Sequence, residues 1–259
     1  MNALAIMAEL RGISIPEAGT TRFRAPYKPV ALGALAGRNI GNHHKATRLT
    51  PMHDWHMENG AEMIEAGIWY RPRVYKKLGE TLEEAYIREA RAVRNSVGIV
   101  DVTSLGKIDV QGPDAAEFLN RIYANAFLKI PVGKARYGVM LREDGYMFDD
   151  GTCWRLSETQ FLMTTTTANA ASVLTELERL LALVWPDLKV HVSSVTDQWA
   201  GMAIAGPKSR DVLVKIIDDI DFSEEGLPYM AVADGHIGEI PVKIARLSFS
   251  GERAYEIYA

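Results

Sequence analysis

Cysteine is almost absent from this sequence, because Cys153 is the only one among 259 residues. An internal disulfide framework is therefore excluded, and a reducing compartment is indicated. A single cysteine could still serve as a thiol nucleophile. However, Cys153 stands beside Trp154 in a run typical of a β-strand, so we interpret it as a structural side chain.

Long apolar runs are also missing. No stretch approaches the roughly 18 to 20 residues that a membrane helix needs, and the opening MNALAIMAELRG lacks the basic-then-apolar order of a signal peptide. The net charge is −4, which gives no electrostatic reason to expect nucleic-acid binding. We therefore expect a globular, cytoplasmic protein with neither a membrane nor a nucleic acid as partner.

Nucleotide-binding motifs are missing too. The glycines at 33, 37 and 41 are four apart and do not form a G-x-G-x-x-G fingerprint. The Gly-Lys pairs at 106–107 and 133–134 lack the upstream glycine of a phosphate-binding loop. Residues 1–45 are rich in Gly, Pro and basic residues with little periodicity, which indicates a connector, and residues 46–259 remain for a folded domain.

From residue 81 onward, signals for helices and strands follow one another regularly. Thr81 and Glu84 form a capping box that should start a helix, and Gly98 should end it. Two stretches share one pattern, an apolar strand that runs through Gly-Pro into a helix, with Gly-Pro at 112–113 and 206–207. Further elements expected are a helix over 168–183 and strands over 136–165 and 229–259. The pattern predicts an α+β fold with two similar strand-turn-helix subdomains.

Four of the six histidines cluster between residues 43 and 56 and could suggest a metal site. His53 and His56 can share one helix face, but no third ligand stands at a defined spacing. We therefore predict no metal. His43, His44, His53 and His56 are interpreted as hydrogen-bonding groups in a loop or at an interface, and the sequence leaves their role open.

Two polar stretches leave alternatives open. In LREDGYMFDDG, residues 141–151, Asp144-Gly145 is a hairpin signal, and strand alternation puts Asp149 and Asp150 on opposite faces. An inward carboxylate is costly unless it is paired or used, so a structural and a ligand-handling role both remain possible. The threonine run 164–167 could be a β-branched strand before a helix cap or the lining of a polar pocket.

Six runs of the sequence together resemble a known family: GTTRFRAPYKPVALGALAG, RLTPMHDWH, VGIVDVTSLGKIDVQGPDAAEFLNRIY, VGKARYGVMLREDGYMFDDGT, MTTTTANA and SFSGERAYEI. They are similar to the C-terminal part of the alpha subunits of heterotetrameric sarcosine oxidases. That part is itself similar to the aminomethyltransferase, or T-protein, of the glycine cleavage system. The resemblance implies a T-protein-like folate-binding fold, truncated at its C-terminus, with residues 1–45 as a connector from an upstream nucleotide-binding region.

The resemblance also implies a function. In this family the N-methyl carbon of sarcosine is oxidised at a flavin on another subunit, and the methylene group passes to tetrahydrofolate to give 5,10-methylenetetrahydrofolate. This chain would supply the folate site, with flavin (FAD or FMN) and NAD elsewhere in the complex and a flavin-bearing beta subunit among its partners. Alone, it should be inactive in oxidation. The alternatives are a non-catalytic folate-binding or interaction fragment, and a T-protein-like aminomethyltransferase, against which the connector argues.

Site residues are carried over from the resemblance position by position. Asp150 matches the aspartate near folate N10, where a carboxylate can accept a proton and stabilise positive charge. Glu256 matches the glutamate that pairs with the pterin through both oxygens, and Tyr137 matches an aromatic that packs against the folate. The remaining positions carried over are Leu105, Tyr229, Phe249, Thr166 and Asn169. The arginine for the glutamate tail would lie beyond Ala259.

Overall fold

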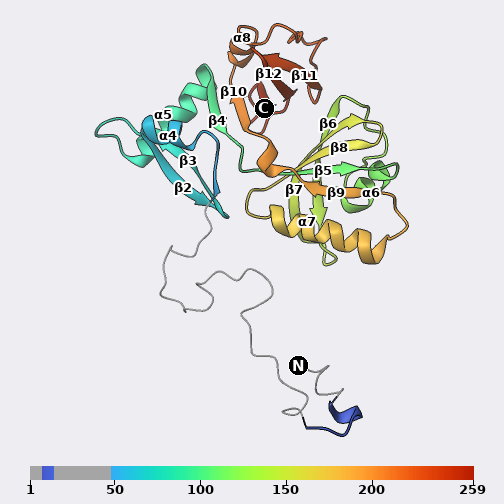
Figure 1. Ribbon diagram of the computed structural model, residues 1–259. Coiled ribbons are helices and arrows are strands. Elements are labelled where there is room, and N and C mark those ends of the chain that lie inside the picture. The colour runs from blue at the N-terminus through green and yellow to red at the C-terminus, as the bar shows by residue number, and fades with distance from the viewer. Residues whose placement is uncertain (1–7, 15–47) are drawn as a thin grey trace. The chain divides into compact units, whose positions relative to one another are not determined.

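The computed structural model describes residues 8–14 and 48–259, so the predictions for His43, His44 and most of the connector lie outside the described residues. The chain divides into two compact units, Met1–Ala46 and Thr47–Ala259. In the first unit, residues 8–10 form a helical turn. Every element named below belongs to the second unit (Figure 1). No helix among the described residues is long and apolar enough to cross a membrane.

The second unit is built on three β-sheets. Its elements in chain order are β1 (Arg48–Leu49), α4 (His53–Glu58), β2 (Ala61–Ala66), β3 (Trp69–Tyr75), α5 (Leu82–Asn95), β4 (Gly98–Asp101), β5 (Gly106–Gln111), α6 (Ala115–Ile122), β6 (Lys134–Leu141), β7 (Met147–Ser157), β8 (Gln160–Thr165), α7 (Ala170–Arg179), the π-helix η2 (Leu180–Val184), β9 (His191–Ser194), the 3-10 helix η3 (Thr196–Gln198), β10 (Gly201–Ala205), α8 (Ser209–Leu213), β11 (Val232–Ile237), β12 (Ile240–Ala245) and β13 (Ala254–Tyr258). The strand orders are β1-β3-β2, β11-β12-β13-β10-β4 and β6-β7-β8-β5-β9. The predicted α+β class is confirmed.

The helix predicted from Thr81 forms, but it ends earlier than expected. Thr81 and Glu84 make the capping box, in which each side chain bonds the other residue's backbone N–H. The helix ends at Asn95, and Gly98 is the first residue of β4. A Cβ at Gly98 would lie 2.5 Å from Cγ2 of Val93. Glycine is therefore needed here for the strand to pass close to the helix, not as the helix stop that the sequence suggested.

The repeated strand-turn-helix pattern is confirmed, with one copy in each five-stranded sheet. Strand β5 leads through Gly112 into α6, and β10 leads through Gly206 into α8. Both glycines have positive φ, +141° and +122°, and a Cβ on either would collide with a backbone carbonyl oxygen, at 2.0 Å from Lys189 and 2.4 Å from Ser96. The second copy is shorter, since α8 has five residues, and Ile216, which lies beyond the end of α8, is 44% exposed.

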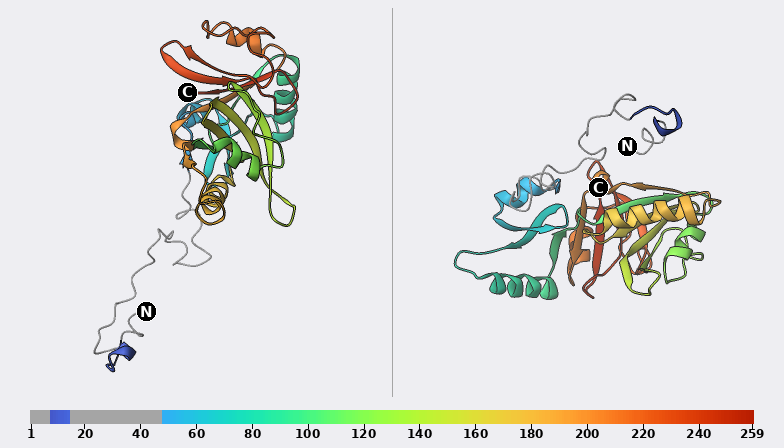
Figure 2. Two further views of the ribbon diagram at one scale, coloured as in Figure 1. Left: turned by 90° about the vertical axis from the view of Figure 1, so that its right-hand side faces the viewer. Right: turned by 90° about the horizontal axis from the view of Figure 1, so that it is seen from below.

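Three hydrophobic clusters hold the helices and the two five-stranded sheets together. Helices α6 and α7 cover one face of the β6–β9 sheet, and α8 covers the other five-stranded sheet (Figure 2). The third cluster lies between the two sheets, where the Trp154 and Tyr258 rings stack with centroids 4.7 Å apart. Cys153 points to the helix-covered side, where complete burial raises the pKa of its thiol to about 12. This agrees with a structural role, because a reactive thiol needs an accessible thiolate.

Candidate functional site

A cavity of about 520 Å³ lies where the two five-stranded sheets meet. The first sheet contributes β6, β7 and the end of β8, and the second contributes β13 together with the segments before β11 and after β12. The lining residues are Leu105, Tyr137, Asp150, Gly151, Thr152, Thr164, Thr165, Thr166, Tyr229, Met230, Leu247, Ser248, Phe249 and Glu256. The cavity thus collects residues that are up to 151 positions apart in the sequence, from 105 to 256.

Seven of the eight positions carried over from the resemblance line this cavity: Leu105, Tyr137, Asp150, Thr166, Tyr229, Phe249 and Glu256. The eighth, Asn169, does not. Its side-chain amide donates to the carbonyl oxygen of Phe148 at 2.8 Å, and it precedes α7, which packs on the opposite face of the sheet. The chain therefore leaves the cavity between Thr166 and Asn169.

Strand alternation separates the two adjacent aspartates, as predicted. Asp149 is buried and accepts hydrogen bonds from the backbone N–H and the hydroxyl of Thr166, at 3.1 and 2.6 Å. Burial raises the pKa of Asp149, although these bonds oppose the shift. Asp150 points to the other face and lines the cavity. The structural role thus belongs to Asp149, and the cavity-facing carboxylate is that of Asp150.

Tyr137 and Asp150 form the first polar pair in the cavity. They lie on neighbouring strands, with Val139 as the register partner of Asp150, so their side chains meet diagonally on one face. The Tyr137 hydroxyl donates to Oδ2 of Asp150 at 2.8 Å, and this bond raises the pKa of the Tyr137 phenol. Among the described residues, Oδ1 of Asp150 accepts no hydrogen bond, so it is available to a ligand in the cavity.

Glu256 supplies the second carboxylate, from the opposite sheet. On β13, Tyr255 and Ile257 pack into the core under α8, so alternation turns Glu256 and Tyr258 toward the first sheet. The Tyr258 hydroxyl donates to Oε2 of Glu256 at 2.9 Å. Burial raises the pKa of the Glu256 carboxyl, while this hydrogen bond and the charge of Lys107 work against the increase. Protein surrounds the carboxylate, which reaches solvent through the cavity.

Sequence reasoning missed several wall residues. Met230 is the only described residue other than glycine with positive φ, at 63°. Two hydrogen bonds hold its backbone, from its N–H to the Arg246 carbonyl at 2.9 Å and from the Ala135 N–H to its own carbonyl at 2.7 Å. No local sequence signal marks a methionine in this conformation. The aromatic residues Tyr229 and Phe249, by contrast, were predicted, and they are 56% and 103% exposed.

The histidines do not form a metal site in the described part of the chain. His56 in α4 is buried, with Nε2 3.0 Å from Oδ2 of Asp101 and Nδ1 within hydrogen-bonding distance of the Tyr75 hydroxyl. Burial opposes ionisation of Asp101, but hydrogen bonds from Thr103 and His56 outweigh it and lower the pKa of that carboxyl. In residues 8–14 and 48–259, no group of three His, Cys, Asp or Glu side chains could hold a metal ion.

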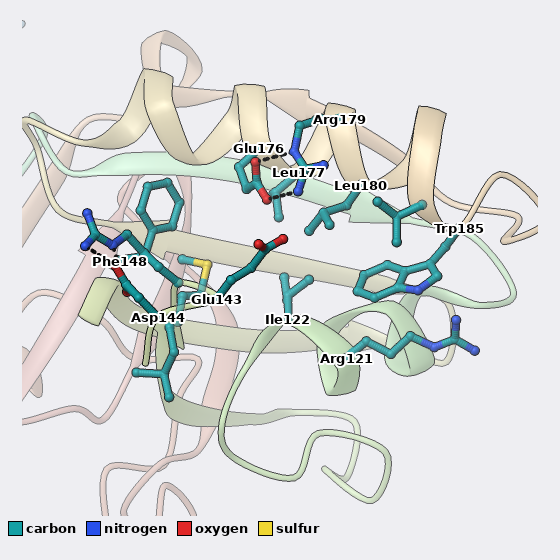
Figure 3. Close-up of a pocket in the computed structure, with 14 residues that line it drawn as sticks. Arg121, Ile122, Glu143, Asp144, Phe148, Glu176, Leu177, Arg179, Leu180 and Trp185 are labelled. Atoms are coloured by element: carbon teal, nitrogen blue, oxygen red, sulfur yellow. Dashed lines mark hydrogen bonds and ion pairs between the residues drawn. The ribbon is translucent and has the colours of Figure 1, made fainter. Parts of the chain in front are cut away.

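A second and larger cavity, of about 700 Å³, lies between α6, the β6–β7 hairpin and α7 (Figure 3). Its walls are mainly apolar, and Trp185 and Ile122 face into it. Its arginines are already paired with acids close in sequence, such as Arg179 with Glu176 at 2.7 Å. A ligand site combines an apolar cavity with a few convergent polar groups that fix the orientation of the ligand, and the larger cavity lacks such free groups. The candidate site is therefore the smaller cavity.

Comparisons with known proteins agree with the resemblance. Residues 52–259 match the family described as the GCVT N-terminal domain, and residues 1–38 match the sarcosine oxidase A3 domain. The sarcosine oxidase subunit alpha of Rhizobium meliloti is 51% identical over 260 residues, which cover 99% of this chain and 26% of that protein. An aminomethyltransferase of Thermotoga neapolitana is 33% identical over 208 residues, which cover 80% of this chain and 53% of that protein.

The chain therefore spans about a quarter of the length of the sarcosine oxidase relatives that it matches. Among solved structures, the crystal structure of glycine cleavage system aminomethyltransferase T from Bartonella henselae matches with a TM-score of 0.68. It is 23% identical, and the match covers 82% of this chain and 53% of that one, which shows a shared fold. Because the sequence match takes in nearly all of the second unit, the chain belongs to the GCVT N-terminal domain family.

Proposed function

We propose that this chain is the folate-binding part of a sarcosine oxidase alpha subunit, which accepts the methylene group from oxidised sarcosine onto tetrahydrofolate. The product would be 5,10-methylenetetrahydrofolate. The observation that carries the proposal is the cavity itself, in which two carboxylates from different sheets, Asp150 and Glu256, line one space together with exposed aromatic rings. Such a combination suits a flat, nitrogen-rich ligand that carries several N–H donors.

The comparisons favour this function over the aminomethyltransferase alternative. Identity to a sarcosine oxidase alpha subunit is 51% over 99% of the chain, against 33% over 80% for an aminomethyltransferase. The match to the sarcosine oxidase A3 domain at residues 1–38 points the same way. The flavin, the NAD and the flavin-bearing beta subunit would then belong to other parts of a larger complex, and this chain alone would not oxidise sarcosine.

The residues present fit a folate. The Glu256 carboxylate has one oxygen engaged by Tyr258, and its other oxygen, Oε1, accepts no hydrogen bond from the described residues. The Glu256 carboxylate could therefore accept charge-assisted hydrogen bonds from the ring N–H and the amino group of a pterin. Tyr137, Tyr229 and Phe249 offer aromatic faces for stacking.

Asp150 would carry out the proton transfer of this reaction. Tetrahydrofolate supplies the two nitrogens, N5 and N10, between which the one-carbon unit is held. Asp150 would accept the proton released from N10, and its negative charge would stabilise a cationic one-carbon group that enters the cavity. Tyr137 would orient the carboxylate through the 2.8 Å hydrogen bond. The apolar side chains of Leu105, Met230 and Leu247 would limit access of water, which otherwise hydrolyses the group to formaldehyde.

The proposal is tested by Asp150→Asn in the complete enzyme complex that contains this chain. Sarcosine consumption should stay unchanged, because oxidation takes place elsewhere. Formation of methylenetetrahydrofolate should fall by about 10²-fold, the lower end of the range for losing a general base, with free formaldehyde taking its place.

The matched control is Asp144→Asn, which makes the same change at the exposed hairpin tip, where Asp144 pairs with Arg142. This variant should behave like the unmodified enzyme. If Asp150→Asn leaves the yield of methylenetetrahydrofolate unchanged, the role given to Asp150 is wrong. If the unmodified complex does not bind tetrahydrofolate in a calorimetric titration, the folate-binding function itself is wrong.

A further inference from the structure

Lys107 is the only buried lysine in the described part of the chain, with 0% of its surface exposed. It lies on β5, where Ile108 points into the core under α6 and α7. Lys107 therefore points the other way, toward the second five-stranded sheet, and its register partner on β8 is Thr164, which lines the candidate site. The lysine thus stands directly behind one wall of the cavity.

The ammonium group has no ion-pair partner within 4 Å among the described residues. Instead, Nζ donates to the carbonyl oxygens of Thr103 at 2.7 Å and Leu105 at 3.1 Å. It also lies 5.2 Å from the centroid of the Tyr258 ring, a cation–π distance. A buried cation without a direct counter-ion is costly, and an apolar side chain of the same length would avoid that cost. The arrangement therefore calls for a role beyond packing.

The hydrogen bonds of Lys107 and its contact with the Tyr258 ring both connect it to residues of the candidate site. Leu105, whose carbonyl accepts from Lys107, is a lining residue. Tyr258, whose ring faces Lys107, donates its hydroxyl to Glu256. The charged groups that act on Lys107 are Asp101 on β4, Glu256 on β13 and Asp197 in η3. Of these three carboxylates, only that of Glu256 lines the cavity.

We propose that Lys107 is a positioning residue of the candidate folate site, whose buried charge keeps Glu256 ionised and whose hydrogen bonds fix the loop that carries Leu105. The proposal rests on the folate-binding function proposed above. A pterin offers N–H donors, so Glu256 binds it best as a carboxylate, yet burial of Glu256 favours its protonated form. The positive charge of Lys107 counteracts that tendency without occupying space in the cavity.

Electrostatics at neutral pH agree with this role. Burial lowers the pKa of Lys107 to about 8, with the charges of Asp101, Glu256 and Asp197 opposing the decrease. The lysine is therefore mostly protonated at pH 7. Because coupling between two charges is reciprocal, removing the charge of Lys107 should raise the pKa of Glu256, and removing the charge of Glu256 should lower that of Lys107.

The test measures Glu256 directly and needs no folate. In protein labelled with ¹³C at the glutamate side-chain carboxyl, the NMR signal that disappears in Glu256→Gln belongs to Glu256, and its shift is followed against pH. In Lys107→Met the midpoint should move up by about one pH unit, the lower end of the effect of an opposite charge nearby. Ile108→Val, a buried change on the same strand that faces away from Glu256, should leave the midpoint in place.

Lys107→Gln separates charge from hydrogen bonding, because its amide can still donate to a loop carbonyl but carries no charge. Its midpoint should move as in Lys107→Met. If neither variant folds, the reciprocal measurement remains: the pKa of Lys107, followed in ¹³C-lysine-labelled protein, should be lower in Glu256→Gln than in the unmodified chain. A Glu256 midpoint that is unchanged in both lysine variants would overturn the proposal, and so would an unchanged pKa of Lys107 in Glu256→Gln.

Folate binding then gives a separate readout. In Lys107→Met the affinity for tetrahydrofolate should fall by about tenfold at pH values below the Glu256 midpoint, matching the expected one-unit shift, and should recover above the raised midpoint, where Glu256 is ionised in both proteins. A purely structural defect would weaken binding equally at all pH values and would refute the electrostatic role. Failure of the unmodified chain to bind folate would count against the proposed function, whereas the NMR result judges the coupling of Lys107 to Glu256 independently.

Discussion

Replacement of Glu256 by glutamine tests the proposed folate site most directly, because it keeps the shape of the side chain and removes its charge. A carboxylate can accept from two neighbouring pterin donors, whereas an amide offers one acceptor and sets an NH₂ donor against the second pterin donor. One charge-assisted hydrogen bond is then lost, which costs about 1.5–3 kcal/mol. Each 1.4 kcal/mol is tenfold in affinity, so the dissociation constant of tetrahydrofolate should rise roughly 10- to 150-fold.

The same substitution should also change the pH dependence of folate affinity. The folded pKa of Glu256 lies above the ordinary 4.5, because burial disfavours the carboxylate. The raised pKa therefore contributes to the stability of the fold below pH 4.5, and this contribution is lost as pH rises through the folded-state pKa of Glu256. Binding of a donor-rich pterin has the opposite sign, because it needs the ionised form. Affinity of the unmodified chain should increase as pH rises through the raised pKa and then level off, and in Glu256→Gln this dependence should disappear.

Isothermal titration calorimetry under anaerobic conditions, repeated at several pH values, measures both effects. Glu239→Gln serves as the matched control, since Glu239 is exposed at the turn between β11 and β12. It makes the same chemical change away from the cavity and should bind folate as the unmodified chain does. Equal affinity in Glu256→Gln and in the unmodified chain, at every pH, would refute the assignment of Glu256 to the pterin.

Two further predictions concern stability. A Cβ at Gly151 would lie 2.0 Å from the carbonyl oxygen of Thr164, so Gly151→Ala should lower the free energy of unfolding by about 1–3 kcal/mol in urea denaturation, and an unchanged value would show that β7 and β8 can separate at no cost. His56→Ala removes a hydrogen-bonding partner from the buried carboxylate of Asp101 and should cost about 3 kcal/mol by the same measurement; a loss under about 0.5 kcal/mol would mean that the pair does not stabilise the fold.

The parts of the fold that rest on local signals could be predicted from the sequence. The capping box at Thr81 depends on neighbouring residues alone, and it forms where expected. The Gly-Pro junctions also form where expected, although Gly112 and Gly206 in addition make room for the distant carbonyl oxygens of Lys189 and Ser96. The end of the helix before Gly98 could not be predicted in this way. Glycine is required at this position by the close contact with Val93 and not by the geometry of a helix end. A local sequence pattern therefore predicted an element correctly where the residues of that pattern alone determine the element.

The cavity shows the same division. Alternation along one strand correctly predicted that Asp149 and Asp150 face opposite ways, and the resemblance supplied residues that the structure brings together. The burial of Lys107 could not be predicted from the sequence, because it depends on β13, which lies about 150 residues further along the chain. A lysine in a strand with ordinary alternation is normally an exposed residue. Only the packing of the second sheet against the first reveals that this one is enclosed.

The two adjacent aspartates have one physical explanation in common. Asp149 binds the backbone and hydroxyl of Thr166, and so fixes the chain just beyond the end of β8, at the rim of the cavity. Gly151 lets β7 approach Thr164 closely enough for that contact to form. Because side chains alternate, an acid that must reach Thr166 from β7 leaves the next position facing the cavity. A structural acid at 149 therefore makes 150 the place on this strand from which a second carboxylate can meet a ligand.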